Sequence, residues 1–225
     1  MWGGIQVIYK KKVEDEERYE HFRIIEGVYI AEKDNYILLK RIVESIMAIC
    51  GIFILSPVLI IISILIKIDS KGPIIYSQER LGVNGKRFRV LKFRSMVVDA
   101  EKGGPQWATK DDNRITKFGH FIRKTRIDEL PQLLNILRGD MGIIGPRPER
   151  PIFTEKFSEE IPNFRDRLVI RPGLTGWAQV NGGYDITPRE KFELDMYYIK
   201  NMSVLLDMKI LVKTIKVVIT GEGAR

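Results

Sequence analysis

The sequence has little cysteine and little histidine, and both shortages exclude classes of protein. Its 225 residues include one cysteine, Cys50, and two histidines, His21 and His120. A single cysteine excludes an intrachain disulfide and a cysteine-based metal site, so a reducing compartment is expected. Both histidines are interpreted as ordinary surface or partly buried residues. Residues 1–39 have mixed charge, with neither an early apolar core nor a cleavage site, so no signal peptide is expected.

Acidic charge is scarce relative to basic charge. Lysine and arginine number 37, against 29 aspartates and glutamates, which gives a formal net charge of +8. Such an excess favours an anionic partner: nucleic acid, an anionic membrane surface or a phosphorylated substrate. The sequence has no nucleic-acid recognition motif, and its strongly apolar segment argues against nucleic acid. The length suits one domain, or one domain with an appendage.

One hydrophobic run, residues 42–66, is long, and it contains a single acid, Glu44. As a helix it would measure roughly 37 Å, against about 30 Å for the hydrocarbon core of a bilayer. Arg41 lies three positions before Glu44 and is expected to pair with it on one helical face. A buried core helix is the alternative, but so long a run exceeds what a small soluble core usually needs. We therefore predict a membrane helix within residues 40–71, preceded by a polar extension at 1–39.

Ser56-Pro57 interrupts this run near its middle. Proline removes a backbone donor and clashes with the preceding turn, and a neighbouring serine can cover the freed carbonyl in lipid. Two topologies remain open: a spanning helix with an ordinary kink, or a re-entrant helix that enters and leaves on one face. The re-entrant form, broken at Ser56-Pro57, is favoured because lysine and arginine prefer the cytoplasmic side. Such residues flank both ends of the run: Lys40, Arg41, Lys67 and Lys71.

Residues 72–225 are predicted to form a cytoplasmic α+β domain that is mainly helical. Residues 72–96 have the pattern of two strands joined at Asn84-Gly85, which is a strong hairpin signal. The cations of this segment could hold phosphates or lie against anionic lipid. They are Arg80, Lys86, Arg87, Arg89, Lys92 and Arg94.

Helical periodicity predicts further helices within 113–142, 187–201 and 203–223. Gly139 is expected to end a helix, and Thr187 to cap one that has Pro188 in its first turn. Residues 169–183 are predicted to form a turn and a short strand-like stretch. The last two helices are expected to be amphipathic, and they could either lie in the membrane interface or cover the core.

Two adjacent acids, Asp128 and Glu129, begin a leucine-rich segment. The simplest interpretation is that Asp128 caps a helix and Glu129 favours its first turn. The alternative is chemical, because a helix start suits a phosphate and a carboxylate can act as a nucleophile at phosphorus. A divalent cation together with arginines would offset the charge repulsion. Arg123 is within reach if the preceding segment turns, so the pattern allows phosphoryl transfer without proving it.

Arg147 lies between Pro146 and Pro148. The two prolines restrict the backbone on both sides, so the side chain is presented from a stiff segment. The forked guanidinium suits phosphate oxygens. A turn with a purely structural role is the alternative.

Several long motifs, in order, resemble those of the bacterial sugar transferase family, the monotopic phosphoglycosyl transferases that start polysaccharide and glycoconjugate assembly. They run from Lys40 to Gly223: KRIVE, LSPV, GPIIYSQERLGVNGKRFRVLKFRSM, RITKFGHFIRKTRIDELPQLLNILRGDMGIIGPRPE, RPGLTGWAQVNG and ELDMYYIKN. The family usually has aspartate where Glu44 stands. Longer members carry a bundle of spanning helices and a further domain ahead of this core, so a catalytic-core version is expected here.

The resemblance implies a reaction and a role for each motif. Family members move a sugar-1-phosphate from a UDP-sugar to polyprenyl (undecaprenyl) phosphate, through a covalent aspartyl phosphosugar, at the cytoplasmic face of the bacterial inner membrane. Asp128 matches the nucleophile, Glu129 the second acid, and both are expected to bind the cofactor, Mg²⁺. The residues expected to bind substrate are Arg123, Arg147, Lys92, Arg94 and Arg171. Membrane lipid and downstream glycosyltransferases are the other candidate partners.

A second class of function remains open. A basic membrane-surface scaffold would use the same anchor and the same cations, but it would not need Asp128. The sequence does not name the sugar, and residues 181–195 are expected to help select it.

Overall fold

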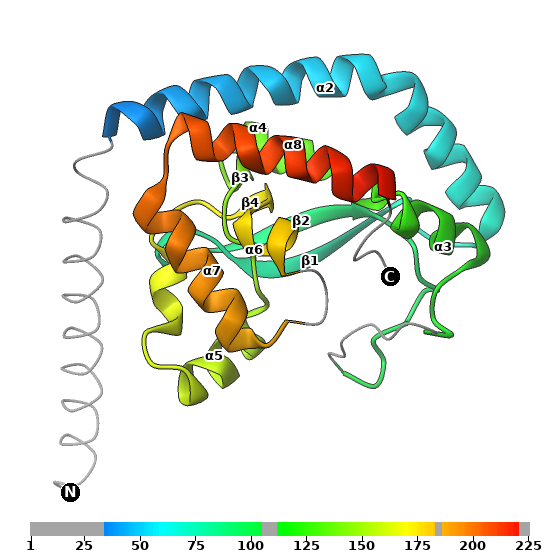
Figure 1. Ribbon diagram of the computed structural model, residues 1–225. Helices are drawn as coiled ribbons and strands as arrows, with labels where there is room; N and C mark the ends of the chain where they lie inside the picture. Colours follow the sequence, from blue (N-terminus) through cyan, green and yellow to red (C-terminus); the bar gives the residue numbers. More distant parts are fainter. Residues whose placement is uncertain (1–33, 105–111, 183–185, 221–225) are drawn as a thin grey trace, which may run out of the picture.

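The computed structural model describes residues 34–104, 112–182 and 186–220 (Figure 1). It is a mainly helical α+β structure in which a long apolar helix, α2 (Asp34–Asp69), arches over a smaller body with two small sheets. The predicted fold class is confirmed at this level. Most of the predicted extension, together with His21, lies outside the described residues.

Helix α2 begins earlier than its hydrophobic run because the first turns also pack on the body. Tyr36 and Ile37 lie against the larger core cluster, in which Ala48 of α2 is fully buried beside Ile136. The C-terminal half of α2 packs on a second cluster through Ile62. These contacts at both ends fix the helix to one body.

The outward face of α2 is apolar and bare. Its most hydrophobic 18-residue window has a mean hydropathy of 3.0, yet only 11% of that window is buried. Phe53 and Ile54 are 81% and 71% exposed. The core helix of a soluble protein would be mostly buried, so the exposed apolar surface indicates membrane association.

The predicted break at Ser56-Pro57 is not observed. Helix α2 is continuous through Pro57, and Figure 1 shows it curving so that its C-terminal part turns toward α3. Pro57 has no N–H to donate to the Phe53 carbonyl four residues earlier, and the Ser56 hydroxyl donates to that oxygen instead, at 2.8 Å. The substitute hydrogen bond allows a bend without a break.

Glu44 does not have the predicted partner. Its carboxylate lies 2.8 Å from Lys40 Nζ and accepts a hydrogen bond from the Ile144 amide at 3.0 Å. Arg41 instead donates to the carbonyl of Ile136, 3.2 Å away. The single acid of the apolar run therefore connects α2 to strand β3 (Gly142–Ile144).

The predicted hairpin is confirmed. Strands β1 (Ile75–Leu81) and β2 (Arg87–Phe93) pair antiparallel through a tight turn, η2 (Val83–Gly85). Asn84 and Gly85 both have positive φ, 53° and 72°, a conformation that asparagine and glycine tolerate best. The second sheet, β3 with the parallel strand β4 (Gly173–Thr175), was only half predicted, because three-residue strands leave almost no periodic signal.

The predicted helices are present, and residues 221–223, at the end of the last predicted helix, lie outside the described residues. Gly139 ends one of them at φ 90°, and Thr187 caps another through a capping box with Glu190. The interpretation of Asp128 as a helix cap is wrong, because Asp128 lies inside a single 3₁₀ turn that follows Arg126. The elements are α3 (Lys117–Lys124), η3 (Ile127–Glu129), α4 (Gln132–Arg138), α5 (Pro151–Glu160), η4 (Phe164–Leu168), α6 (Trp177–Asn181), α7 (Pro188–Asn201) and α8 (Val204–Thr220).

Helix α8 has two different faces. Ile210 is fully buried in the larger core cluster, while Leu205 and Ile219 are 82% and 78% exposed. Lys209 and Lys213 lie over the ring of Trp177, at 5.4 and 5.0 Å from its centroid. The helix thus covers the core and presents apolar side chains outward, as an interfacial helix would.

Candidate active site

A cavity of about 760 Å³ opens between the hairpin, η3, the segment after β3 and the start of α7. Most of the residues predicted from sequence line it, although they lie far apart in the chain. They are Lys92, Arg94, Arg123, Asp128, Glu129 and Arg147. Arg171 is not among the lining residues. The structure thus brings both acids together with four of the five predicted cations.

The two acids have different surroundings. Glu129 Oε1 lies 2.6 Å from Arg147 Nη2 and 2.7 Å from Lys92 Nζ. Asp128 Oδ2 lies farther from the same Lys92 Nζ, at 3.9 Å. Both acids are nearly buried, 8% and 9% exposed. Glu129 is therefore neutralised by two cations, while Asp128 keeps its carboxylate oxygens less engaged.

These surroundings move the two pKa values apart. Burial raises the pKa of Asp128 to about 6, an increase that Lys92 opposes and the charge of Glu129 adds to. Burial would raise the pKa of Glu129 as well, but Arg147 and Lys92 outweigh it and hold that pKa well below its usual value. Two neighbouring carboxyl groups whose pKa values are shifted in opposite directions in one cavity are typical of acids with different catalytic roles.

The 3₁₀ turn explains how adjacent acids reach different partners. Arg126 precedes it with φ 56°, a left-handed conformation that redirects the chain between α3 and α4. Successive side chains of a helical turn point in different directions, so Glu129 faces Lys92 and Arg147 while Asp128 stands beside them. Arg123, in the last turn of α3, lines the same cavity and lowers the pKa of Asp128.

Two of the predicted substrate-binding arginines have other surroundings. Arg94 lines the cavity, but its guanidinium donates to the carbonyls of Ser70 and Lys71, at 2.6 and 3.1 Å, at the C-terminus of α2. Arg171 lies instead near Arg41 and Glu44, and burial lowers its pKa. The geometry thus gives Arg94 a helix-capping contact and places Arg171 on the side of the body that faces α2.

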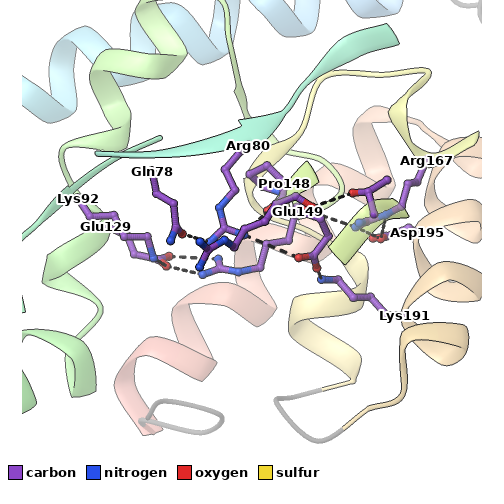
Figure 2. Close-up of polar contacts among 12 residues, drawn as sticks. Gln78, Arg80, Lys92, Glu129, Pro148, Glu149, Arg167, Lys191 and Asp195 are labelled. Carbon is purple, nitrogen blue, oxygen red and sulfur yellow. Dashed lines mark hydrogen bonds and ion pairs between the residues drawn. The ribbon is translucent and has the colours of Figure 1, made fainter. Parts of the chain in front are cut away.

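Sequence reasoning missed a buried ionic network next to the acids (Figure 2). One pair, 42 residues apart in the chain, joins the segment after Arg147 to α7. The other pair, 28 residues apart, joins η4 to α7. No local spacing could have revealed pairs so distant. The members are Glu149 with Lys191, and Arg167 with Asp195. Burial would raise the pKa of Glu149, but Lys191 and Arg167 hold it at about 2.

The donor set for a metal ion is small. Among the described residues, no group of three or more histidine, cysteine, aspartate or glutamate side chains could hold one. Magnesium in phosphoryl-transfer enzymes usually has one or two protein carboxylates and takes its other ligands from water and substrate phosphates. Asp128 and Glu129 fit that pattern, as ligands that a diphosphate would complete.

Comparison with known proteins matches residues 35–221 to the family described as Bacterial sugar transferase. The UDP-N-acetylgalactosamine-undecaprenyl-phosphate N-acetylgalactosaminephosphotransferase of Aeromonas hydrophila is 47% identical over 194 residues, which cover 84% of this chain and 46% of that protein. A putative undecaprenyl-phosphate N-acetylgalactosaminyl 1-phosphate transferase of Bacillus subtilis (strain 168) is 53% identical over 145 residues, 64% of this chain and 81% of that protein.

A third relative names another sugar. The UDP-glucose:undecaprenyl-phosphate glucose-1-phosphate transferase of Escherichia coli (strain K12) is 40% identical over 183 residues, 79% of this chain and 39% of that protein. The chain spans less than half the length of the Aeromonas and Escherichia relatives. The family match covers most of the chain and includes both acids and every cation of the cavity, and the chain therefore belongs to the bacterial sugar transferase family.

Proposed function

We propose that this protein transfers a sugar-1-phosphate from a UDP-sugar to undecaprenyl phosphate, and that Asp128 carries the phosphosugar between them. The observation that carries the proposal is the cavity in which Asp128 has a long contact, 3.9 Å, with Lys92, while Lys92 and Arg147 lie within 2.7 Å of Glu129 and neutralise it. The names of the relatives supply the two substrates, UDP-sugar and undecaprenyl phosphate.

The reaction proceeds in two displacements. An Asp128 carboxylate oxygen attacks the phosphorus that bears the sugar, the bond from that phosphorus to the bridging oxygen breaks, and UMP leaves with the electron pair. An oxygen of the lipid phosphate then attacks the same phosphorus and releases the Asp128 carboxylate. The products are UMP and undecaprenyl diphosphosugar.

The surrounding cations have defined tasks in this scheme. Lys92, Arg123 and Arg147 offset the charge of the diphosphate and of the developing leaving group. Glu129 holds Lys92 and Arg147 in place. A magnesium ion bound by the acids and the diphosphate would supply further charge neutralisation.

A scaffold without chemistry is less well supported. It would need the apolar surface of α2 and the exposed cations, but not a nearly buried carboxyl group whose pKa burial raises to about 6. Burying an incompletely paired carboxylate costs stability, so its presence favours a catalytic purpose. UMP release from UDP-sugars, with magnesium and undecaprenyl phosphate in detergent or nanodiscs, distinguishes the two functions.

Removal of magnesium is expected to stop the reaction. A carboxylate that attacks a diphosphate meets strong repulsion, which the cations of the cavity offset only in part. UMP release should therefore disappear in excess EDTA and return when magnesium is added beyond the chelator. Full turnover in EDTA would rule the requirement out.

We also propose that α2 is re-entrant at the cytoplasmic face of the membrane. Its first turns are bound to α8, where Lys40 Nζ lies 2.8 Å from Asp207. Its C-terminal end is bound by Arg94, which donates to the carbonyl of Ser70, the residue that follows α2. Because one body grips both ends, the bend near Pro57 would dip into the bilayer and return.

Cysteine labelling tests this topology. Cysteines placed singly before Lys40, with Cys50 replaced, should resist an impermeant thiol reagent in intact cells and react after permeabilisation. Replacing Ser56 and Pro57 with leucine should straighten α2 and expose the same positions outside. Labelling of the unmodified helix from outside would show that α2 spans.

A further inference from the structure

Residues 146–150, the segment that presents Arg147, accept a hydrogen bond at every carbonyl, although they form no strand. The oxygens of Pro146 and Glu149 accept from the amides of Gly173 and Leu81, and that of Arg150 accepts from Thr154, all at 2.9 to 3.0 Å. The carbonyls of Arg147 and Pro148 accept from side chains instead. Their donors are two guanidinium groups, Arg167 Nη2 at 2.9 Å and Arg80 Nη1 at 3.3 Å.

Arg167 is the more deeply buried of these two donors. Its side chain is 1% exposed, and its partner Asp195 is 2% exposed. Nε and Nη2 of Arg167 both donate to Oδ2 of Asp195, at 3.0 and 2.5 Å, and the guanidinium lies 5.2 Å from the ring centroid of Phe164. Figure 2 shows Arg167 and Asp195 beside Glu149 in the view. Burying an ion pair costs desolvation energy, which is offset only by good geometry and further hydrogen bonds.

The Arg167–Asp195 pair is connected to Glu129 through Arg147. Arg167 binds the main-chain oxygen of Arg147, and the Arg147 side chain binds Glu129 at 2.6 Å. A shift of this carbonyl would move the guanidinium that faces the cavity. Asp195 of α7 is thus connected to Glu129 through Arg167 and then Arg147.

We propose that Arg167, oriented by Asp195, is a positioning residue that sets the guanidinium of Arg147 for the phosphosugar transfer. The proposal rests on the function proposed above. A guanidinium is required at this position because one end must pair with a carboxylate while another N–H reaches a carbonyl. Lysine could keep the charge beside Asp195 but could not hold both partners in one plane.

The test is a double-mutant cycle between Arg167→Lys and Arg147→Ala. In the wild-type background, Arg167→Lys should lower kcat/KM for UDP-sugar on the order of tenfold, the size of a lost charged hydrogen bond. In the Arg147→Ala background it should cost almost nothing further, because the group that it positions is gone. Asp195→Asn should behave in the same way, and covers the case in which Arg167→Lys does not fold. Arg165→Lys, in the same short helix, is the charge-conserving control and should leave kcat/KM near the wild-type value.

The same cycle is measured as UDP-sugar affinity in an Asp128→Asn background, where no turnover is needed. If Arg167→Lys caused the same loss of kcat/KM or of affinity with Arg147 present as with Arg147→Ala, Arg167 would only stabilise the fold. That result would overturn the proposal. Failure of the proposed function has a different signature, namely no UMP release by the wild-type protein. The positioning role would then still be decided by the cycle of UDP-sugar affinities.

Discussion

Asp128→Asn is expected to abolish UMP release while the protein stays folded and membrane-bound. Asparagine has nearly the same shape as aspartate, but its amide cannot attack phosphorus. The loss should reach at least about a thousandfold, as for removal of other catalytic nucleophiles. Removing the charge should not harm the fold, because burial already disfavours the Asp128 carboxylate and its contact with Lys92 is long, 3.9 Å.

Mass spectrometry extends this prediction to the covalent step. Wild-type protein incubated with UDP-sugar alone should gain the mass of a phosphosugar on the peptide that contains Asp128, and the asparagine variant should not. Glu79→Gln is the control for loss of an acid elsewhere, since Glu79 is an exposed acid of the β1–β2 hairpin that pairs with Arg87. Substantial turnover by Asp128→Asn, or an adduct on another residue, would contradict the assignment.

The elements that were predicted correctly are those specified by local chemistry. The hairpin follows from Asn84-Gly85, and α7 follows from Thr187 and Pro188, because a turn or cap depends on a few adjacent residues. The apolar surface of α2 was equally readable. The bend in α2 was misjudged as a break because the hydroxyl of Ser56 replaces the missing donor, a matter of side-chain geometry.

The sequence predicted most of the residues that line the cavity, but not which residues contact one another there. Lys92 and Arg94 are two residues apart and, on a regular strand, would point to the same side. Strand β2 ends at Phe93, so Lys92 reaches Glu129 while Arg94 turns to the C-terminus of α2. The sequence motif identifies both cations, but it does not show that Lys92 contacts Glu129 while Arg94 contacts the end of α2.

The different environments of Asp128 and Glu129 are even harder to predict from the sequence. They depend on Arg147, which comes from another segment, and on the buried pair of Arg167 and Asp195 that fixes it. Such partners are set by tertiary packing, so only the structure identifies which acid is neutralised.

Arg147→Ala is expected to cause the second largest loss of activity. It removes a guanidinium that lines the cavity, and it leaves Glu129 with Lys92 as its remaining cation partner. Truncating one partner of a hydrogen-bonded charge pair costs about 2 to 5 kcal/mol, which corresponds to roughly two orders of magnitude or more in kcat/KM. The comparison is Arg147→Lys, which keeps the charge but loses the fork and should recover only part of this activity.

Arg87→Ala controls for the loss of one positive charge, because Arg87 is exposed on the same hairpin as Lys92 and pairs with Glu79. Its kcat/KM should stay near the wild-type value, since a screened surface ion pair contributes little. Thermal unfolding separates stability from catalysis: the Arg147→Ala protein should remain folded at the assay temperature, because the segment 145–150 is held through its main chain rather than through this side chain. If Arg147→Ala kept near-normal activity, Arg147 would have a structural role only, and Lys92 alone would have to neutralise Glu129. The cavity would then bind the diphosphate without the cation that the Pro146–Pro148 segment presents to it.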